Sequence, residues 1–311
     1  MNKLIITSLI VVGISLAAIG DEPKAPDKKP VEKQKIQSPI ENLKPEQLPS
    51  YLQDVSVTIH ADGSQGSGVI KIKDGVTYVL TCGHVVESLR HERKSVNPKT
   101  GSRVEFDDAK VVKEIYEDGR SVGYVALDAE VVRYSDAENG EDLALLRVRK
   151  KNLFKNTVVF SNETKPVPVG NKLFHVGSLL GQIGSNSLTT GIVSQHGRVR
   201  SNTVFDQSTA SSFHGSSGGG LFNEKGEYIG MVVRGAGETF NLYVPMRRIL
   251  EWADRVEIGF ILDEKADTPD EDIMKKSVEE LIKVDDKPKV IVIKKSVQEF
   301  DKEFPLLPVK K

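Results

Sequence analysis

Apolar and polar residues alternate over short stretches in the middle of the chain, and this pattern predicts antiparallel β-strands. In the first half, the predicted strands cover residues 55–59, 69–72, 76–80, 102–106, 109–115, 123–132 and 143–147. In the second half, they cover residues 167–169, 172–176, 187–195, 204–207, 219–222, 228–233 and 240–244. Asp74-Gly75, between two of these stretches, predicts a tight hairpin turn. Clear helical spacing occurs at residues 246–253, so the pattern indicates an all-β fold followed by a helix.

The N-terminal part of the chain does not have this pattern. Residues 4–19 are almost continuously apolar and follow Lys3, which is typical of a signal peptide covering residues 1–20. The alternative is an uncleaved membrane anchor, for which the apolar run is slightly short. Residues 21–50 are rich in Lys, Glu and Pro and predict a solvated linker. We therefore expect an exported protein, periplasmic or secreted, that contacts a membrane only if the N-terminal segment stays uncleaved.

The composition changes again after about residue 260, where we expect a charged C-terminal extension over residues 261–311. Thr268-Pro269 has the cap and first-turn proline of a helix start, and the apolar residues between 273 and 282 give that helix one apolar face. Residues 289–294 are a further candidate strand. Because this extension is near the lower size limit for independent folding, we expect a helix docked on the main domain and a flexible end.

Composition and charge narrow the classes of partner. Acidic and basic residues nearly balance, with a formal net charge of −1, so a nucleic-acid partner is not expected. Cys82 is the single cysteine, which excludes an intrachain disulfide. It could be a nucleophile or a metal ligand, but at the end of a strand a small buried residue is the favoured interpretation. No Cys/His group has metal-ligand spacing, so neither a metal nor a cofactor is expected.

A run of glycines and serines at residues 215–220 stands directly before an apolar strand. Ser217 lies in the pattern Gly-x-Ser-Gly-Gly, and glycines allow the backbone angles of a sharp turn that would expose a nucleophile. The alternative is a plain Ser/Gly linker or hairpin loop.

Two upstream residues supply what a nucleophilic serine needs. His84 follows the apolar run 78–80, and histidine can accept a hydroxyl proton near neutral pH. Asp142 stands at the start of an apolar strand, where a buried carboxylate can orient an imidazole. Taken singly, His84 could be an ordinary surface or core histidine. Together, in the order His, Asp, Ser, the three residues predict a catalytic triad.

The order of these residues also separates competing folds. Residues 215–219 match the Gly-x-Ser-x-Gly pattern of α/β-hydrolases, in which the catalytic histidine follows the serine. All 6 histidines precede Ser217, which excludes that fold. A subtilisin-like order needs an acid before the histidine, which Asp54 or Asp62 could supply, but the alternation of strands and long helices is missing.

Three blocks of the sequence resemble the catalytic blocks of trypsin-fold serine peptidases. They are Thr81-Cys82-Gly83-His84, Asp142-Leu143-Ala144-Leu145-Leu146 and Gly215-Ser216-Ser217-Gly218-Gly219. Further segments, among them Gly66-Ser67-Gly68 and Gly191-Ile192-Val193-Ser194, are similar to the bacterial HtrA/Deg-type branch. The resemblance implies two antiparallel six-stranded β barrels within residues 51–260, with the triad at their junction. A PDZ domain, usual in that branch, is not expected in the short C-terminal extension.

The resemblance also assigns further site residues. The backbone N–H groups of Gly215 and Ser217 match the family's oxyanion donors. The base of the specificity pocket falls at Ser211 and its walls at Val233-Arg234-Gly235 and Asn241. Ser211 and Asn241 supply no carboxylate, so we expect a preference for uncharged side chains before the cut, apolar or small. The alternative is that Arg234, Phe213 and His214 crowd the entrance and the pocket lies elsewhere. Ser216 stands where the digestive branch has an aspartate that pairs with a newly cut N-terminus, which puts that form of activation in doubt.

These observations predict an exported serine endopeptidase that hydrolyses protein or peptide substrates through an acyl-enzyme. The rival from another class is a catalytically inactive, trypsin-fold binding module. The triad residue types favour the enzyme.

Overall fold

The computed structural model describes residues 39–94, 102–162, 165–200, 203–235, 239–270 and 278. The predictions for the signal peptide, for residues 21–38 of the linker and for residues 289–294 lie outside this part. So does most of the predicted C-terminal helix. Within the described residues, no helix is both long and apolar enough to cross a membrane.

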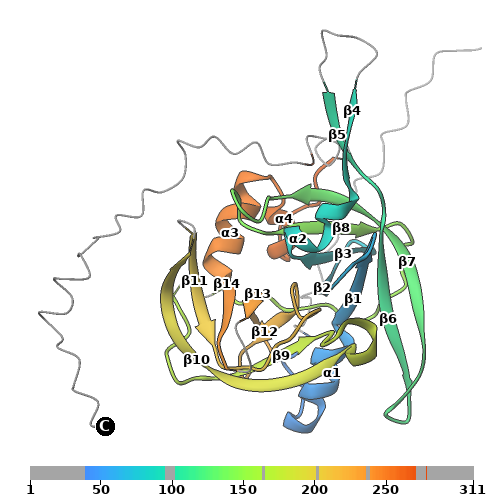
Figure 1. The fold of residues 1–311 in the computed structure, drawn as a ribbon. Helices are drawn as coiled ribbons and strands as arrows, with labels where there is room; N and C mark the ends of the chain where they lie inside the picture. Colours follow the sequence, from blue (N-terminus) through green and yellow to red (C-terminus); the bar gives the residue numbers. More distant parts are fainter. Residues whose placement is uncertain are drawn as a thin grey trace, which may run out of the picture. The chain divides into compact units, whose positions relative to one another are not determined.

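The first six-stranded sheet is an antiparallel, closed barrel in the order β1-β2-β3-β8-β7-β6 (Figure 1). Its strands are β1 (Ser56–Ala61), β2 (Ser64–Lys73), β3 (Val76–Thr81), β6 (Ala109–Glu117), β7 (Arg120–Tyr134) and β8 (Ala144–Val148). β6 pairs back onto β1, which closes the ring. Between β3 and β6, the strands β4 (Arg90–Lys94) and β5 (Ser102–Phe106) form a separate two-stranded sheet.

The second sheet is also antiparallel and ring-like, in the order β10-β11-β14-β13-β12-β9. Its strands are β9 (Lys172–Gly177), β10 (Ser187–Arg200), β11 (Thr203–Ser208), β12 (Gly220–Phe222), β13 (Tyr228–Gly235) and β14 (Asn241–Pro245). β9 pairs with both β10 and β12. The fold is therefore mostly β, in agreement with the predicted class.

The described helices are short. They are η1 (Pro45–Gln47), α1 (Leu48–Asp54), α2 (Gly83–Val86), η2 (Glu87–Leu89), η3 (Gly181–Gly184), α3 (Met246–Arg255) and α4 (Gly259–Leu262). α3 agrees with the helical spacing at residues 246–253, and its Trp252 is fully buried. One apolar core includes residues from both sheets and from α1, α3 and α4, so the loops at the ends of the strands are held against each other.

Part of residues 21–50, where the composition indicates a linker, packs on the main domain. α1 starts at Leu48, and Leu48, Tyr51 and Leu52 are buried. The Tyr51 hydroxyl donates to the Thr157 carbonyl at 2.6 Å, and Lys113 donates to the Gln53 carbonyl at 3.2 Å at the end of the helix. Pro49 in the first turn of α1 is a helix-start signal that the Lys/Glu/Pro composition obscures.

The chain also remains packed beyond residue 260, where the charged extension is predicted to begin. Ile261 on α4 is 3% exposed. Lys71 on β2 pairs with Glu264 at 3.2 Å, and Lys73 donates to the Glu264 carbonyl at 2.9 Å. Burial lowers the pKa of Lys71, and Glu264 opposes that effect. Further along, the Val278 carbonyl accepts the Tyr134 N–H at 2.8 Å.

Two local differences from the predicted strands have physical reasons. The strand predicted at residues 167–169 is absent, because Pro166 and Pro168 lack the N–H groups that a ladder needs. β4 has five polar residues in succession and no apolar alternation that would have predicted it. The hairpin predicted at Asp74-Gly75 is confirmed, with both residues at positive φ, 49° and 75°.

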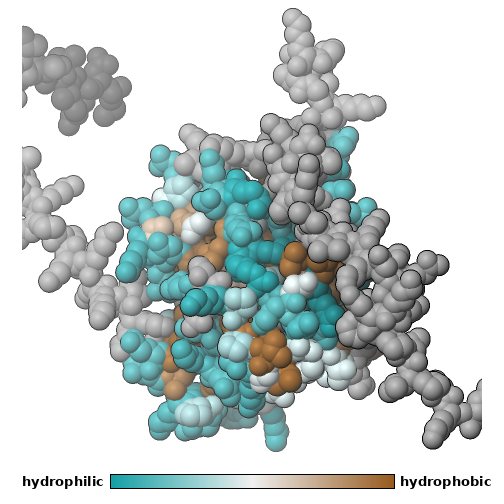
Figure 2. Space-filling model, turned by 90° about the vertical axis from the view of Figure 1, so that its left-hand side faces the viewer, coloured by the Kyte–Doolittle hydropathy of each residue, from teal (hydrophilic) through white to brown (hydrophobic). Residues whose placement is uncertain are grey.

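The face of the molecule in Figure 2 is mainly hydrophilic where it is described, with small, separate apolar patches. The β6–β7 hairpin carries several exposed apolar side chains, at Ile115, Tyr116, Val122, Tyr124 and Val125.

Candidate active site

His84 lies on α2, the single turn that follows β3. Gly83 begins this turn close to the loop after β7, where an added Cβ would lie 2.2 Å from the Ser135 carbonyl oxygen. A larger residue would force α2 away from that loop. The position of the histidine is thus fixed by the short Cys82-Gly83 connection.

Asp142 lies at the end of the loop that leads from β7 into β8. The Asp136 carboxylate accepts N–H groups of Glu138 and Asn139 at 2.9 and 2.6 Å, and the Asp136 carbonyl accepts the Asp142 N–H at 3.2 Å. Asp142 has a φ of 58°, in the left-handed region that few non-glycine residues adopt. Asp136 therefore organises the loop, and Asp142 is the acid that this loop presents.

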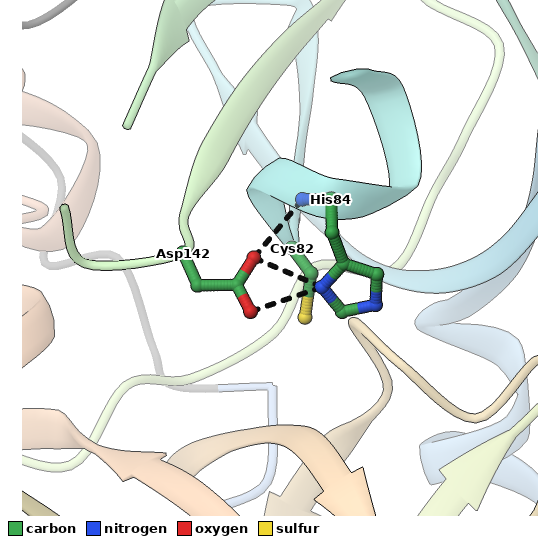
Figure 3. A group of neighbouring side chains, drawn as sticks. All are labelled: Cys82, His84 and Asp142. Atoms are coloured by element: carbon green, nitrogen blue, oxygen red, sulfur yellow. Dashed lines mark hydrogen bonds and ion pairs between the residues drawn. The ribbon is translucent and has the colours of Figure 1, made fainter. Parts of the chain in front are cut away.

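Asp142 and His84 are directly paired, as Figure 3 shows. The His84 Nδ1 lies 2.9 Å from each carboxylate oxygen of Asp142, and the His84 backbone N–H donates to Oδ1 at 3.0 Å. The Asp142 side chain is 2% exposed, while that of His84 is 33% exposed. Because an ionised carboxylate only accepts hydrogen bonds, Nδ1 carries a proton. In the neutral imidazole, Nε2 is then free to accept another.

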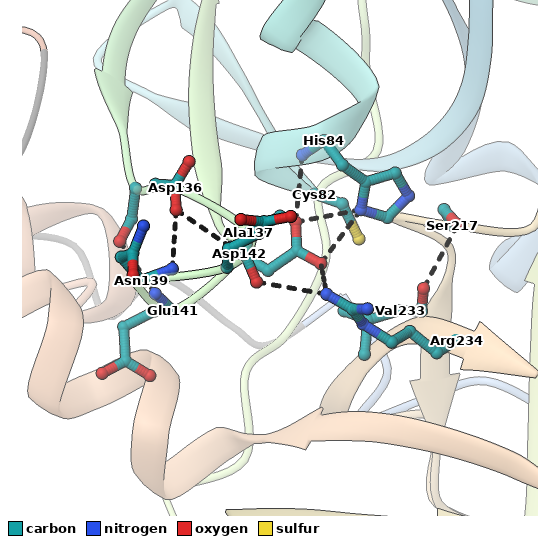
Figure 4. Close-up of polar contacts among 12 residues, drawn as sticks. Cys82, His84, Asp136, Ala137, Asn139, Glu141, Asp142, Ser217, Val233 and Arg234 are labelled. Atoms are coloured by element: carbon teal, nitrogen blue, oxygen red, sulfur yellow. Dashed lines mark hydrogen bonds and ion pairs between the residues drawn. The ribbon is translucent and has the colours of Figure 1, made fainter. Parts of the chain in front are cut away.

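Ser217 is held in a sharp turn whose backbone is bonded to both sheets. The Ser217 carbonyl accepts the Ser67 N–H of β2 at 2.7 Å, and the Gly218 N–H donates to the Val232 carbonyl of β13 at 2.9 Å. Gly218 has a φ of 89°, and an added Cβ would lie 2.0 Å from the Ser67 carbonyl oxygen. The Ser217 hydroxyl donates to the Val233 carbonyl at 3.4 Å, as drawn with the His84 ring in Figure 4.

The turn before Ser217 is equally constrained at Gly215. An added Cβ there would lie 2.2 Å from the Ser178 carbonyl oxygen, and the φ of Gly215 is 92°. The His214 carbonyl accepts the Leu180 N–H at 2.7 Å, and the Gly215 carbonyl accepts the Ser67 hydroxyl at 2.6 Å. Within the described residues, no acceptor is found for the N–H groups of Gly215 and Ser217. The two donors flank the same turn.

Ser216 points into the protein and stabilises the turn. It is 1% exposed, and its hydroxyl accepts the Phe213 N–H at 3.0 Å. Its own N–H donates to the Phe213 carbonyl at 2.9 Å.

Two of the residues assigned to the specificity pocket lie together. Asn241 is fully buried, and its amide donates to the Ala210 carbonyl at 2.6 Å. A Cβ added to Gly235 would lie 2.4 Å from the Asn241 Oδ1, so the glycine makes room for this side chain. Ser212, which the sequence did not indicate, also bonds to Oδ1. Ser211 contributes its carbonyl, which accepts the Thr189 hydroxyl at 2.7 Å.

Cys82 lies behind the paired acid and histidine. Ligand atoms of Cys82, His84 and Asp142 are within 4.8 Å of one another, a proximity that sequence spacing did not reveal. Burial raises the pKa of the Cys82 thiol well above its ordinary value, and the thiol donates to the Val232 carbonyl at 3.4 Å. A protonated thiol is a poor metal ligand. The expectation of no metal stays a prediction.

Two polar residues near the site make contacts that the sequence did not indicate. Ser67 carries the hydrogen bonds to the turn described above, and the only sequence signal is its place in Gly66-Ser67-Gly68. Arg234 on β13 donates from Nη2 to the Ala137 carbonyl at 3.1 Å and lies 4.0 Å from Asp142 Oδ2. A single arginine in a strand gives no such signal.

Comparison with known proteins places the chain in a family. The family model described as "Trypsin-like peptidase domain" matches residues 66–231. A "Probable periplasmic serine endoprotease DegP-like" of Pseudomonas putida is 32% identical over 171 residues, which are 54% of this chain and 28% of that protein.

Two further relatives come from other bacteria. "Serine endoprotease DegS" of Haemophilus influenzae is 30% identical over 57% of this chain and 43% of its own length. "Serine protease Do-like HtrA" of Lactobacillus helveticus is 30% identical over 54% of this chain and 35% of its own. The alignments thus cover less than half of each relative. Since the family model spans more than half of the sequence, the chain belongs to the trypsin-like peptidase family.

Proposed function

We propose that this protein is a serine endopeptidase in which Ser217 is the nucleophile, His84 the general base and Asp142 the orienting acid. The observation that carries the proposal is the pairing of the buried Asp142 carboxylate with His84 Nδ1 at 2.9 Å. This contact directs the basic Nε2 away from the acid, which is the orientation that a serine nucleophile requires. The names of the relatives, all serine proteases or endoproteases, support the same activity.

The proposed reaction proceeds in two halves. Nε2 of His84 takes the proton of the Ser217 hydroxyl as its oxygen attacks the scissile carbonyl carbon. The resulting imidazolium is stabilised by Asp142 and gives its proton to the leaving amine. A water molecule then attacks the acyl-enzyme, with His84 as base, and releases the second product together with free Ser217.

The developing oxyanion would be stabilised by the N–H groups of Gly215 and Ser217. Both donors lie on one turn and have no acceptor within the described residues, so they are available to a substrate. Such donors typically contribute about 3 kcal/mol each to transition-state stabilisation. Before catalysis, the Ser217 hydroxyl must turn from the Val233 carbonyl toward His84.

The remaining assignments belong to the same proposal. The two sheets would form the paired six-stranded barrels of a trypsin-like domain over about residues 51–260. Asn241, Gly235 and Ser211 would line a pocket for uncharged side chains, apolar or small. The apolar N-terminal run and the periplasmic relatives support export, with proteins or peptides as substrates.

A fluorophosphonate probe, which phosphonylates activated serines, tests the proposal. Wild type should be labelled at Ser217, and Ser217→Ala and His84→Ala should not. The inactive binding module is the rival, and it predicts no labelling of correctly folded wild type in any buffer. Mass spectrometry of the labelled peptide identifies the residue.

A further inference from the structure

A neutral His84 ring does not neutralise the negative charge of the buried Asp142 carboxylate. The Asp142 side chain is 2% exposed, so its negative charge is largely removed from water. Oδ1 accepts both the His84 backbone N–H and Nδ1, while for Oδ2 the one hydrogen-bond donor among the described residues is Nδ1. A buried carboxylate without a cation nearby is costly, and a neutral imidazole carries no charge. A positive group close to Oδ2 would reduce this cost.

Arg234 supplies that group from the other sheet. Its Nη2 lies 4.0 Å from Asp142 Oδ2, and its side chain is 33% exposed, so water screens it only in part. The same nitrogen donates to the Ala137 carbonyl at 3.1 Å, a contact between residues 97 positions apart in the chain. Figure 4 shows the guanidinium beside both the Asp142 carboxylate and the Ala137 carbonyl.

The contact with Ala137 gives Arg234 a second, mechanical effect. Ala137 belongs to the loop that turns at Asp136 and ends at Asp142. Because the hydrogen bond joins this loop to β13, it fixes the loop against the strand whose Val233 carbonyl accepts the Ser217 hydroxyl. One side chain thus connects the segments that carry the acid and the nucleophile.

We propose that Arg234 is a positioning residue of the active site: it holds the Asp142 loop through the Ala137 carbonyl and balances the buried Asp142 charge through Oδ2. This inference rests on the proposed serine-peptidase function. Cys82 behind the pair is a buried thiol. Glu141 and Arg200 line the same cavity as Asp142, and Glu141 is paired with Arg248 and Arg255. Among the described cations, Arg234 is the one within 4.0 Å of the Asp142 carboxylate. When His84 gains a proton, the imidazolium is attracted by Asp142 and repelled by Arg234. Removal of Arg234 therefore favours the protonated imidazole, which cannot act as a base.

The rate of phosphonylation by a fluorophosphonate, measured from pH 5 to 9, tests this role without any knowledge of the substrate. We expect Arg234→Met to react about tenfold more slowly, with the acidic limb of the profile displaced by about 0.5 pH unit to higher pH. Arg234→Lys, which keeps the charge but not the planar donor, should keep the limb in place and lose part of the rate. Arg200→Met is the matched control, since Arg200 lines the same small cavity beside Asp142 and, in the part of the chain that the structure describes, makes no ion pair with the carboxylate.

A double-mutant cycle shows whether Arg234 acts through Asp142. In an Asp142→Asn background, Arg234→Met should change the labelling rate by less than about twofold, because the charge to be balanced is gone. Equal tenfold losses in both backgrounds would overturn the proposal, as would a wild-type pH profile for Arg234→Met. A shift of the same size in Arg200→Met would also overturn it.

The outcomes remain interpretable if one variant folds poorly. Circular dichroism and thermal melting show whether each variant is folded. If Arg234→Met is not, the rates and pH profiles of Arg234→Gln and Arg234→Lys are compared with wild type instead. If wild type itself is not labelled while folded, the proposed function fails. If wild type is labelled and Arg234→Met is identical to it, only the role of Arg234 fails.

Discussion

The Ser67 hydroxyl donates a hydrogen bond to the Gly215 carbonyl at 2.6 Å, which connects β2 of the first sheet to the turn before Ser217. The same hydroxyl accepts the Ser178 N–H at 2.7 Å, and the Ser67 N–H donates to the Ser217 carbonyl at 2.7 Å. Ser67 thereby fixes the carbonyl groups on both sides of Ser216. These contacts hold the peptide planes next to those that carry the two proposed oxyanion donors.

We therefore expect Ser67→Ala to lower the rate of amide hydrolysis by about tenfold, because the Gly215 carbonyl and the Ser178 N–H both lose a partner. KM should change less than kcat, since the turn stabilises the transition state more than the bound substrate. Ser64→Ala, on the same strand, is the control. Equal kinetics in wild type and Ser67→Ala would show that backbone contacts alone hold the turn.

The proposed catalytic residues can be singled out from the sequence because each stands in a local pattern, but their supporting contacts cannot. Ser217 lies in a glycine-rich turn, and His84 and Asp142 stand at strand ends. Ser67 and Gly215 are 148 positions apart, and neither sequence neighbourhood indicates the other. Arg234 likewise depends on a contact with Ala137 that only the packing of the two sheets creates.

The same distinction applies to the fold. Alternation predicted most strands, because one face of each is buried in a sheet. The first part of β7, before residue 129, is exposed, so its sequence did not show where the strand begins. The polar β4 has no apolar alternation, so its sequence did not indicate a strand. α2 has four residues, too few for a helical period, although it carries His84.

Asp142→Asn should reduce kcat by about 10⁴, because an asparagine amide facing Nδ1 favours the wrong imidazole tautomer. Asp136→Asn is the matched control: its remaining side-chain oxygen can still accept the Asn139 N–H, which Asp136 accepts at 2.6 Å. We expect that variant to retain activity within about tenfold of wild type. If instead Asp136→Asn caused the larger loss, the assignment of the acid would be wrong. Initial rates on a peptide identified as cleaved by wild type decide between these outcomes.

Lowering the pH should destabilise the folded protein because of His175 on β9. This residue is fully buried behind the nucleophile turn, and burial lowers its pKa from 6.5 to about 4. The folded state therefore binds the proton less readily than the unfolded chain, so stability is fully present above about pH 6.5 and is lost toward pH 4. The loss from this group should be on the order of 3 kcal/mol.

Urea unfolding at intervals from pH 7.5 to 4 measures this contribution. His175→Gln cannot take up the proton, so its free energy of unfolding should decrease less over this range than that of wild type. His91→Gln, which changes a partly exposed histidine, is the control and should keep the wild-type slope. A wild-type pH dependence in His175→Gln would mean that other groups cause the acid destabilisation.

Cleavage specificity should follow from the pairing of Asn241 with its neighbours. Its amide is bonded to the Ala210 carbonyl at 2.6 Å and its Oδ1 to Ser212, so the side chain is fixed across the space in front of Gly235. A lysine or arginine side chain placed there would find no carboxylate and would lose its hydration, which is costly. We expect cuts after small or apolar uncharged residues, as profiled by mass spectrometry on a denatured protein mixture. Asn241→Asp should raise the share of cuts after Lys and Arg, because it adds the missing charge at the same position. Wild-type cuts concentrated after Lys and Arg would show that the pocket lies elsewhere on the domain.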